Sequence, residues 1–93
     1  MANLIVSYDL NGPHPTHAEV DRHLSRIAVR AARVLETVWY VSGTENAATL
    51  AAHMKSLLGP EDRLLVVEAG EASWQNLLIS DDSLLKAWDQ GRS

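Results

Sequence analysis

The chain of 93 residues contains no cysteine, no phenylalanine and no apolar run near the roughly 18 residues that cross a bilayer. The absence of cysteine excludes disulfides, thiolate metal sites and cysteine nucleophiles, and it suits a reducing compartment. Without phenylalanine, the aromatic residues available for the core are three tryptophans and two tyrosines. The N-terminal residues also lack the charged segment of a secretory signal. These absences predict a soluble, cytoplasmic protein with no membrane segment.

Positive charge is also scarce. Eight basic and twelve acidic side chains give a net charge of −4, which argues against tight, non-specific nucleic-acid binding driven by bulk charge. A local basic surface remains compatible with this balance. The length and the 46% of hydrophobic residues predict one globular domain over residues 1–93. A domain this small hides only about 60 to 65% of its unfolded surface, so a partner that covers more would stabilise it.

The first half of the chain predicts strand, helix and strand. The apolar run Leu4–Val6 is typical of a buried strand, and it ends at Asp9 before a cluster of turn-forming residues. Thr16 and Glu19 have the spacing of a capping box, so a helix should begin there. Its apolar spacing continues to about Ala32.

The second half predicts a strand over 34–41, a helix capped by Thr44 that stops at Gly59, and a strand over 64–67. Residues 73–79 alternate in part and favour a short strand, although they would also suit a short helix. Ser80 and the acids after it are typical of a helix start, which predicts a terminal helix over 81–90.

Both faces of the predicted sheet carry apolar side chains, and two helices can cover only one of them. An uncovered second face would be a larger apolar patch than monomers usually expose. We therefore expect a symmetric homodimer that packs through sheet faces or edges. Alternatively, the terminal helix folds back over the second face through Leu84, Leu85 and Trp88.

Three segments together resemble a known family. They are Leu4-Ile5-Val6-Ser7-Tyr8-Asp9, Glu36-Thr37-Val38-Trp39-Tyr40-Val41 and Gly59-Pro60-Glu61-Asp62-Arg63-Leu64-Leu65-Val66. Their order and spacing resemble the small CRISPR-associated adaptation subunit family of antiviral defence, and most of all its stand-alone SinR-type relatives.

The resemblance implies an α/β fold of the α+β sandwich type: a ferredoxin-like βαββαβ domain with an antiparallel sheet. To this core the sequence adds the short C-terminal strand and the terminal helix. Such a fold requires a hairpin or a kink near Glu36 and Thr37. The resemblance also implies a homodimer that in some members is a magnesium-dependent phosphodiesterase, an endonuclease acting on RNA or DNA. Other members are structural bridges that hold DNA beside an integrase.

Asp9 matches the family's acid at the end of the first strand. The resemblance implies that two copies of Asp9 approach across the dimer axis and hold one Mg²⁺, which would activate water and neutralise phosphate charge. The alternative is a strand-end acid that caps the following turn. His14 and His17 lie close enough in sequence to serve as a general base or a third ligand, or they are simply solvated.

Four arginines form the only organised basic feature of the sequence: Arg22, Arg26, Arg30 and Arg33. On one continuous helix they fall within an arc of about 80°, where they could bind phosphates of a nucleic acid. The alternative is a solvated face of weak ion pairs.

Trp39 and Tyr40 could stack on bases, but in a strand beside valines they indicate core or dimer contacts. Trp74 and Trp88 indicate contacts that tie down the C-terminal segment. Three functions therefore remain open: a metal-dependent nuclease, a non-catalytic dimeric scaffold or binding module with a protein partner, and a toxin or phage-defence component.

Overall fold

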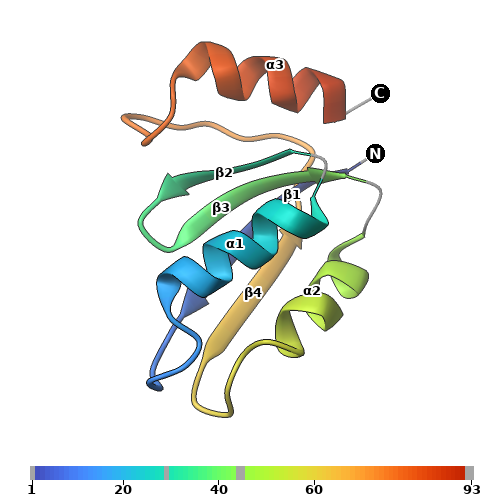
Figure 1. Cartoon of the computed structure of the whole chain (residues 1–93). Helices are drawn as coiled ribbons and strands as arrows, with labels where there is room; N and C mark the ends of the chain where they lie inside the picture. The colour runs from blue at the N-terminus through green and yellow to red at the C-terminus, as the bar shows by residue number, and fades with distance from the viewer. Residues whose placement is uncertain (1, 29, 44–45, 92–93) are drawn as a thin grey trace.

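The computed structural model describes residues 2–28, 30–43 and 46–91. Over these ranges the chain forms four strands and three helices (Figure 1). In chain order they are β1 (Ala2–Asp9), α1 (His17–Ile27), β2 (Arg30–Leu35), β3 (Val38–Gly43), α2 (Ala47–Lys55), β4 (Arg63–Glu68) and α3 (Asp81–Gly91). All neighbouring strands are antiparallel, and the sheet order is β2-β3-β1-β4. The protein therefore has a mixed α+β fold. No helix in the described ranges has the length and apolar character to span a membrane.

The main core lies between the sheet and α1 and α2. Alternation along β1 directs Leu4, Val6 and Tyr8 to this side, and all three are buried. Trp39 from β3 joins them, and Leu24 of α1 packs on the same cluster. The capping box predicted for α1 is confirmed, because Glu19 N–H donates to Thr16 Oγ1 (3.2 Å) and Thr16 N–H donates to Glu19 Oε1 (3.0 Å).

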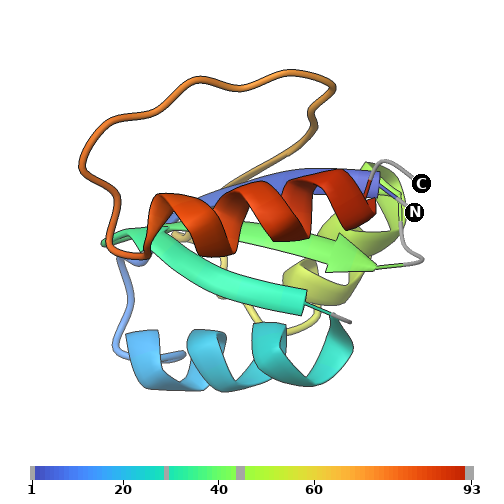
Figure 2. The same ribbon diagram turned by 90° about the horizontal axis from the view of Figure 1, so that it is seen from above.

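The opposite face of the sheet is covered by α3, as Figure 2 shows from above. Tyr40 and Val34 from the strands form a second buried cluster with Leu84 and Trp88 of the helix. The expectation that a second copy covers this face of the sheet is therefore wrong over β1, β2 and β3. The alternative of a folded-back terminal helix describes the chain, although Leu85 stays 49% exposed. The homodimer itself remains a prediction.

The end predicted for the first helix is wrong. α1 ends at Ile27, and Ala28 already has extended dihedrals (φ −104°, ψ 148°). From Arg30 the chain pairs with β3, opposite Ser42. Ala31 then packs on the main core from a strand, which explains why the apolar spacing looks helical beyond the true end.

The single strand predicted over 34–41 is a hairpin. A turn at Glu36 and Thr37 separates β2 from β3, as the family resemblance requires. The cap of α2 is Asn46, whose side chain accepts from Thr49 N–H (2.8 Å), whereas Thr44 lies outside the described residues.

The short strand predicted over 73–79 is also wrong. Residues 69–80 form an irregular connecting segment that crosses the second face of the sheet before α3 begins. Asn76 has a positive φ of 55°, which interrupts extended pairing. Leu78 N–H of this segment donates to Val34 O on β2 (2.9 Å). The predicted terminal helix is confirmed, and Ser80 Oγ accepts from Ser83 N–H (3.1 Å) at its start.

Candidate functional site

The acid singled out by the sequence lies at the end of β1. Asp9 is exposed, and the sheet register places it opposite Arg63 at the start of β4. Both residues line a shallow hollow of about 140 Å³ together with Ser7, Tyr8 and Leu65. The hollow thus combines a carboxylate with a guanidinium.

An acid in the loop just before β4, Asp62, already has backbone partners. Its Oδ1 accepts from Asn11 N–H at 2.7 Å and its Oδ2 accepts from Gly59 N–H at 2.8 Å. These backbone hydrogen bonds lower the pKa of the Asp62 carboxyl. Asn11 also donates from Nδ2 to Glu61 O (2.9 Å). Asp62 therefore holds two loops together and is not a ready second ligand beside Asp9.

One copy of the chain fits a magnesium ion poorly at this place. Magnesium is commonly held by one or two carboxylates together with water and phosphate oxygens. Among the residues that the structure describes, no group of three or more histidine, aspartate or glutamate side chains could hold a metal. A metal at Asp9 would need the carboxylate of a second copy or the phosphate of a substrate.

The two loop histidines have other neighbours. His14 is exposed, and its Nδ1 lies 3.7 Å from Glu19 Oε1 at the capped start of α1. His17 is the first residue of α1, and its ring centroid lies 5.9 Å from that of Tyr8. Both therefore belong to the start of this helix, and neither position indicates a ligand set around Asp9.

The four arginines do not share one helix. Arg22 and Arg26 lie on α1, whereas Arg30 and Arg33 lie on β2, because the helix ends earlier than the sequence predicts. All four are exposed. Alternation along β2 sends Arg30 and Arg33 to different faces of the sheet. The prediction that the four arginines form one continuous arc on a helix is therefore wrong. Their binding to nucleic acid remains a prediction, but the arc no longer supports it.

Trp39 and Tyr40 are buried inside the single chain, with 7% and 1% of their surface exposed. They point to opposite faces of the sheet, Trp39 into the main core and Tyr40 into the α3 cluster. Stacking on a base would require either ring to leave its core.

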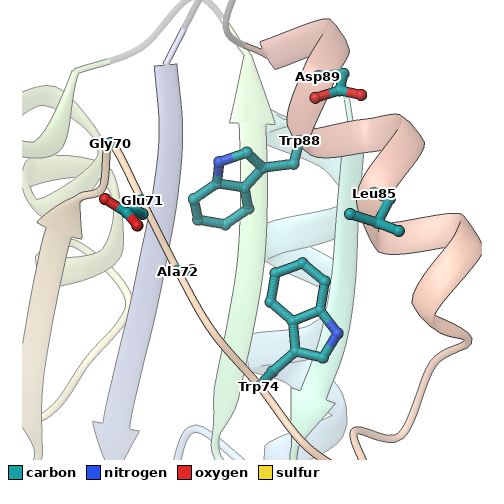
Figure 3. Close-up of a pocket in the computed structure, with 7 residues that line it drawn as sticks. All are labelled: Gly70, Glu71, Ala72, Trp74, Leu85, Trp88 and Asp89. Atoms are coloured by element: carbon teal, nitrogen blue, oxygen red, sulfur yellow. The ribbon is translucent and has the colours of Figure 1, made fainter.

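A larger hollow, of about 410 Å³, lies between the connecting segment and α3 (Figure 3). Its lining residues are Gly70, Glu71, Ala72, Trp74, Leu85, Trp88 and Asp89. We call it the tryptophan groove. The sequence indicates that Trp74 and Trp88 tie down the C-terminal segment, but it gives no sign that they line one cavity, because the connecting segment has no regular structure to anticipate.

No family model matches the chain, and no curated protein or solved structure matches it either.

Proposed function

We propose that this protein is a ferredoxin-like, non-catalytic scaffold that forms a homodimer by pairing the β4 strands of two copies. The observation that supports this proposal is that β4 lies at an open edge of the sheet. Within the described residues β4 pairs with β1 alone, and the sheet order puts it at one edge. Unpaired backbone groups along an edge are a template for another strand.

The ferredoxin-like part of the proposal is supported by chain order and sheet order together. The first six elements follow the pattern βαββαβ. Read from the β4 edge, the antiparallel sheet has the order β4-β1-β3-β2, with α1 and α2 on the same face (Figure 1). The helix α3 is an addition to this pattern.

The hydrogen-bond register identifies which groups point outward. Ala69 N–H donates to Asn3 O (2.9 Å), and Tyr8 N–H donates to Thr37 O (3.1 Å) on the other side of β1. Because backbone groups alternate along a strand, every second residue of β4 faces away from β1. The residues that face the open edge are Leu64, Val66 and Glu68. A twofold axis at Val66 would pair Leu64 of one copy with Glu68 of the other.

Side chains on the second face of β4 support the same surface. The connecting segment leaves the end of β4 and crosses towards β3, so α3 lies away from this strand (Figure 3). Leu65 is 61% exposed and Val67 is 43% exposed. Pairing two β4 strands would set these side chains beside their counterparts, where cross-strand contacts are favourable.

The same geometry separates the two copies of Asp9. In the paired sheet two β4 strands would lie between the two β1 strands, which puts the β1 strands about 14 Å apart from strand spacing alone. One ion cannot bridge that distance between two carboxylates. Pairing at β4 therefore supports a scaffold rather than a shared metal centre.

Light scattering with a Glu68→Pro variant tests the proposal. Proline removes an outward N–H and leaves the bonds to β1, while Glu68→Ala keeps the N–H and is the matched control. The wild type and Glu68→Ala should have twice the 10.2 kDa chain mass at micromolar concentration, and Glu68→Pro should have the single mass. A monomeric wild type, or a Glu68→Pro dimer as stable as the control, would overturn β4 pairing.

A second candidate is the metal-dependent phosphodiesterase implied by the family resemblance. The observation in its favour is the shared hollow of Asp9 and Arg63, because a guanidinium beside a carboxylate could hold a phosphate next to an ion. Magnesium-dependent cleavage of RNA or DNA that Asp9→Asn abolishes, with unchanged far-ultraviolet circular dichroism, would establish it. Absence of cleavage with magnesium, manganese, calcium or zinc would reject it.

A further inference from the structure

We propose that the tryptophan groove binds an arginine side chain presented by a basic segment of a partner protein. This inference concerns a different face from the β4 edge, and it holds whether the protein acts as a monomer or a dimer. It rests on the aromatic lining of the groove, its charge and its shape.

The aromatic lining is fixed in position. Trp74 Nε1–H donates to Asp81 Oδ1 (3.1 Å), which ties the connecting segment to the start of α3. Trp88 is 6% exposed and stacks on Tyr40, with ring centroids 5.5 Å apart and planes at 29°. The rings of Trp74 and Trp88 lie 6.3 Å apart. The half-buried Trp74 thus offers an indole surface that a ligand need not reorganise.

The acidic residues around the tryptophan groove favour a cationic ligand. Residues 70–89, which include the whole lining, contain four acids and one base, Lys86. One of these acids, Glu71, is exposed and lines the groove from the connecting segment, while Asp89 lines it from α3 (Figure 3). A guanidinium can lie flat on an indole and donate paired hydrogen bonds to a carboxylate. Arginine is therefore the side chain that uses both features of the lining.

The shape favours a side chain with its backbone outside. The groove lies between the connecting segment and α3, and a Cβ built on Gly70 meets no atom within 4 Å. Leu85 lines the groove and is 49% exposed, so it offers an apolar contact for residues that flank the arginine. An extended segment could thus insert one long side chain and keep its backbone at the surface.

Nuclear magnetic resonance of the three indole N–H groups tests this directly, using the full chain. The probe is the peptide acetyl-Gly-Ala-Arg-Ala-Arg-Ala-Gly-amide, and its control replaces arginine with citrulline, which has nearly the same shape without the charge. The arginine peptide should shift the indole N–H signals of Trp74 and Trp88. The signal of Trp39, which lies in the other core, should stay unchanged. The citrulline peptide should bind at least fivefold more weakly.

Two charge-reversal variants separate the groove from bulk charge. Glu71→Lys should weaken binding of the arginine peptide about tenfold. Glu36→Lys changes the net charge equally in the exposed β2–β3 turn and should stay within twofold of the wild type. The proposal is overturned by equal weakening in both variants, by equal binding of the citrulline peptide, or by no shift of Trp74 and Trp88 at 5 mM peptide.

Discussion

Replacing Tyr40 with phenylalanine should weaken the attachment of α3 to the sheet. The Tyr40 hydroxyl lies 2.6 Å from Asn3 Oδ1 and 2.9 Å from Ala87 O, so it reaches both β1 and α3. Asn3 in turn donates from Nδ2 to Trp88 O at 3.0 Å. Tyr40 and Asn3 are 1% and 3% exposed, so water cannot readily replace the lost partner.

The expected cost is about 2 kcal/mol in the free energy of unfolding, because a buried acceptor without a donor costs about 1–3 kcal/mol. For a domain of this size that corresponds to a fall in Tm of roughly 10 °C. Urea and thermal unfolding followed by circular dichroism measure both quantities. Amide hydrogen exchange should also accelerate throughout α3 before it changes in α1 and α2.

Tyr8→Phe is the matched control for this experiment. Tyr8 is 2% exposed, but its hydroxyl lies 3.4 Å from Asp21 Oδ1, beyond the usual length of a good O–H···O bond. Its removal should cost less than removal of the Tyr40 hydroxyl, because the bond to Asp21 is long. Equal losses in Tyr40→Phe and Tyr8→Phe would refute the reasoning that the Tyr40 hydroxyl holds α3.

Three further outcomes follow from the polar contacts. Thr16→Ala should destabilise the protein by about 1 kcal/mol in urea unfolding, because it removes the cap of α1. Asp62→Asn should accelerate exchange of the Asn11 and Gly59 amides. Because the pKa of Asp62 is lowered in the folded state, this difference should be present above pH 4 and disappear as the pH falls through that lowered pKa. Burial raises the pKa of Tyr8 and of Tyr40, so the unfolded state releases these protons first, and stability measured by urea should decrease as the pH rises above about 10.

Local signals in the sequence correctly predicted the starts of two helices. The capping box of Thr16 and Glu19 predicted the start of α1, and Ser80 predicted the start of α3, because both use side chains within three residues. The end of α1 cannot be predicted from such local signals. Ala28 is a good helix former, and its extended conformation follows from the pairing of β2 with β3, which joins residues far apart in sequence.

The cover of the second face shows the same limit. Apolar alternation correctly indicated that both faces of the sheet carry side chains to bury, but it could not decide between a partner and the C-terminal helix. The contacts that join α3 to the sheet include long-range polar ones, such as Asn3 to Trp88 O, and these leave no periodic pattern. The tryptophan groove was missed for the related reason that its wall is the irregular segment 69–80.

The position of α3 also bears on how two copies can meet. A dimer that packs its second sheet faces together would have to displace α3 and expose Leu84 and Trp88, which are 3% and 6% exposed. Each such side chain contributes about 1.5–3 kcal/mol by burial, and the hydrogen bonds of Asn3 and Tyr40 would be lost as well. Pairing at β4 requires none of these losses, because its outward groups and Leu65 already lie at the surface. Pairing at the β4 edge is therefore an association that the folded chain could make without first unfolding part of itself.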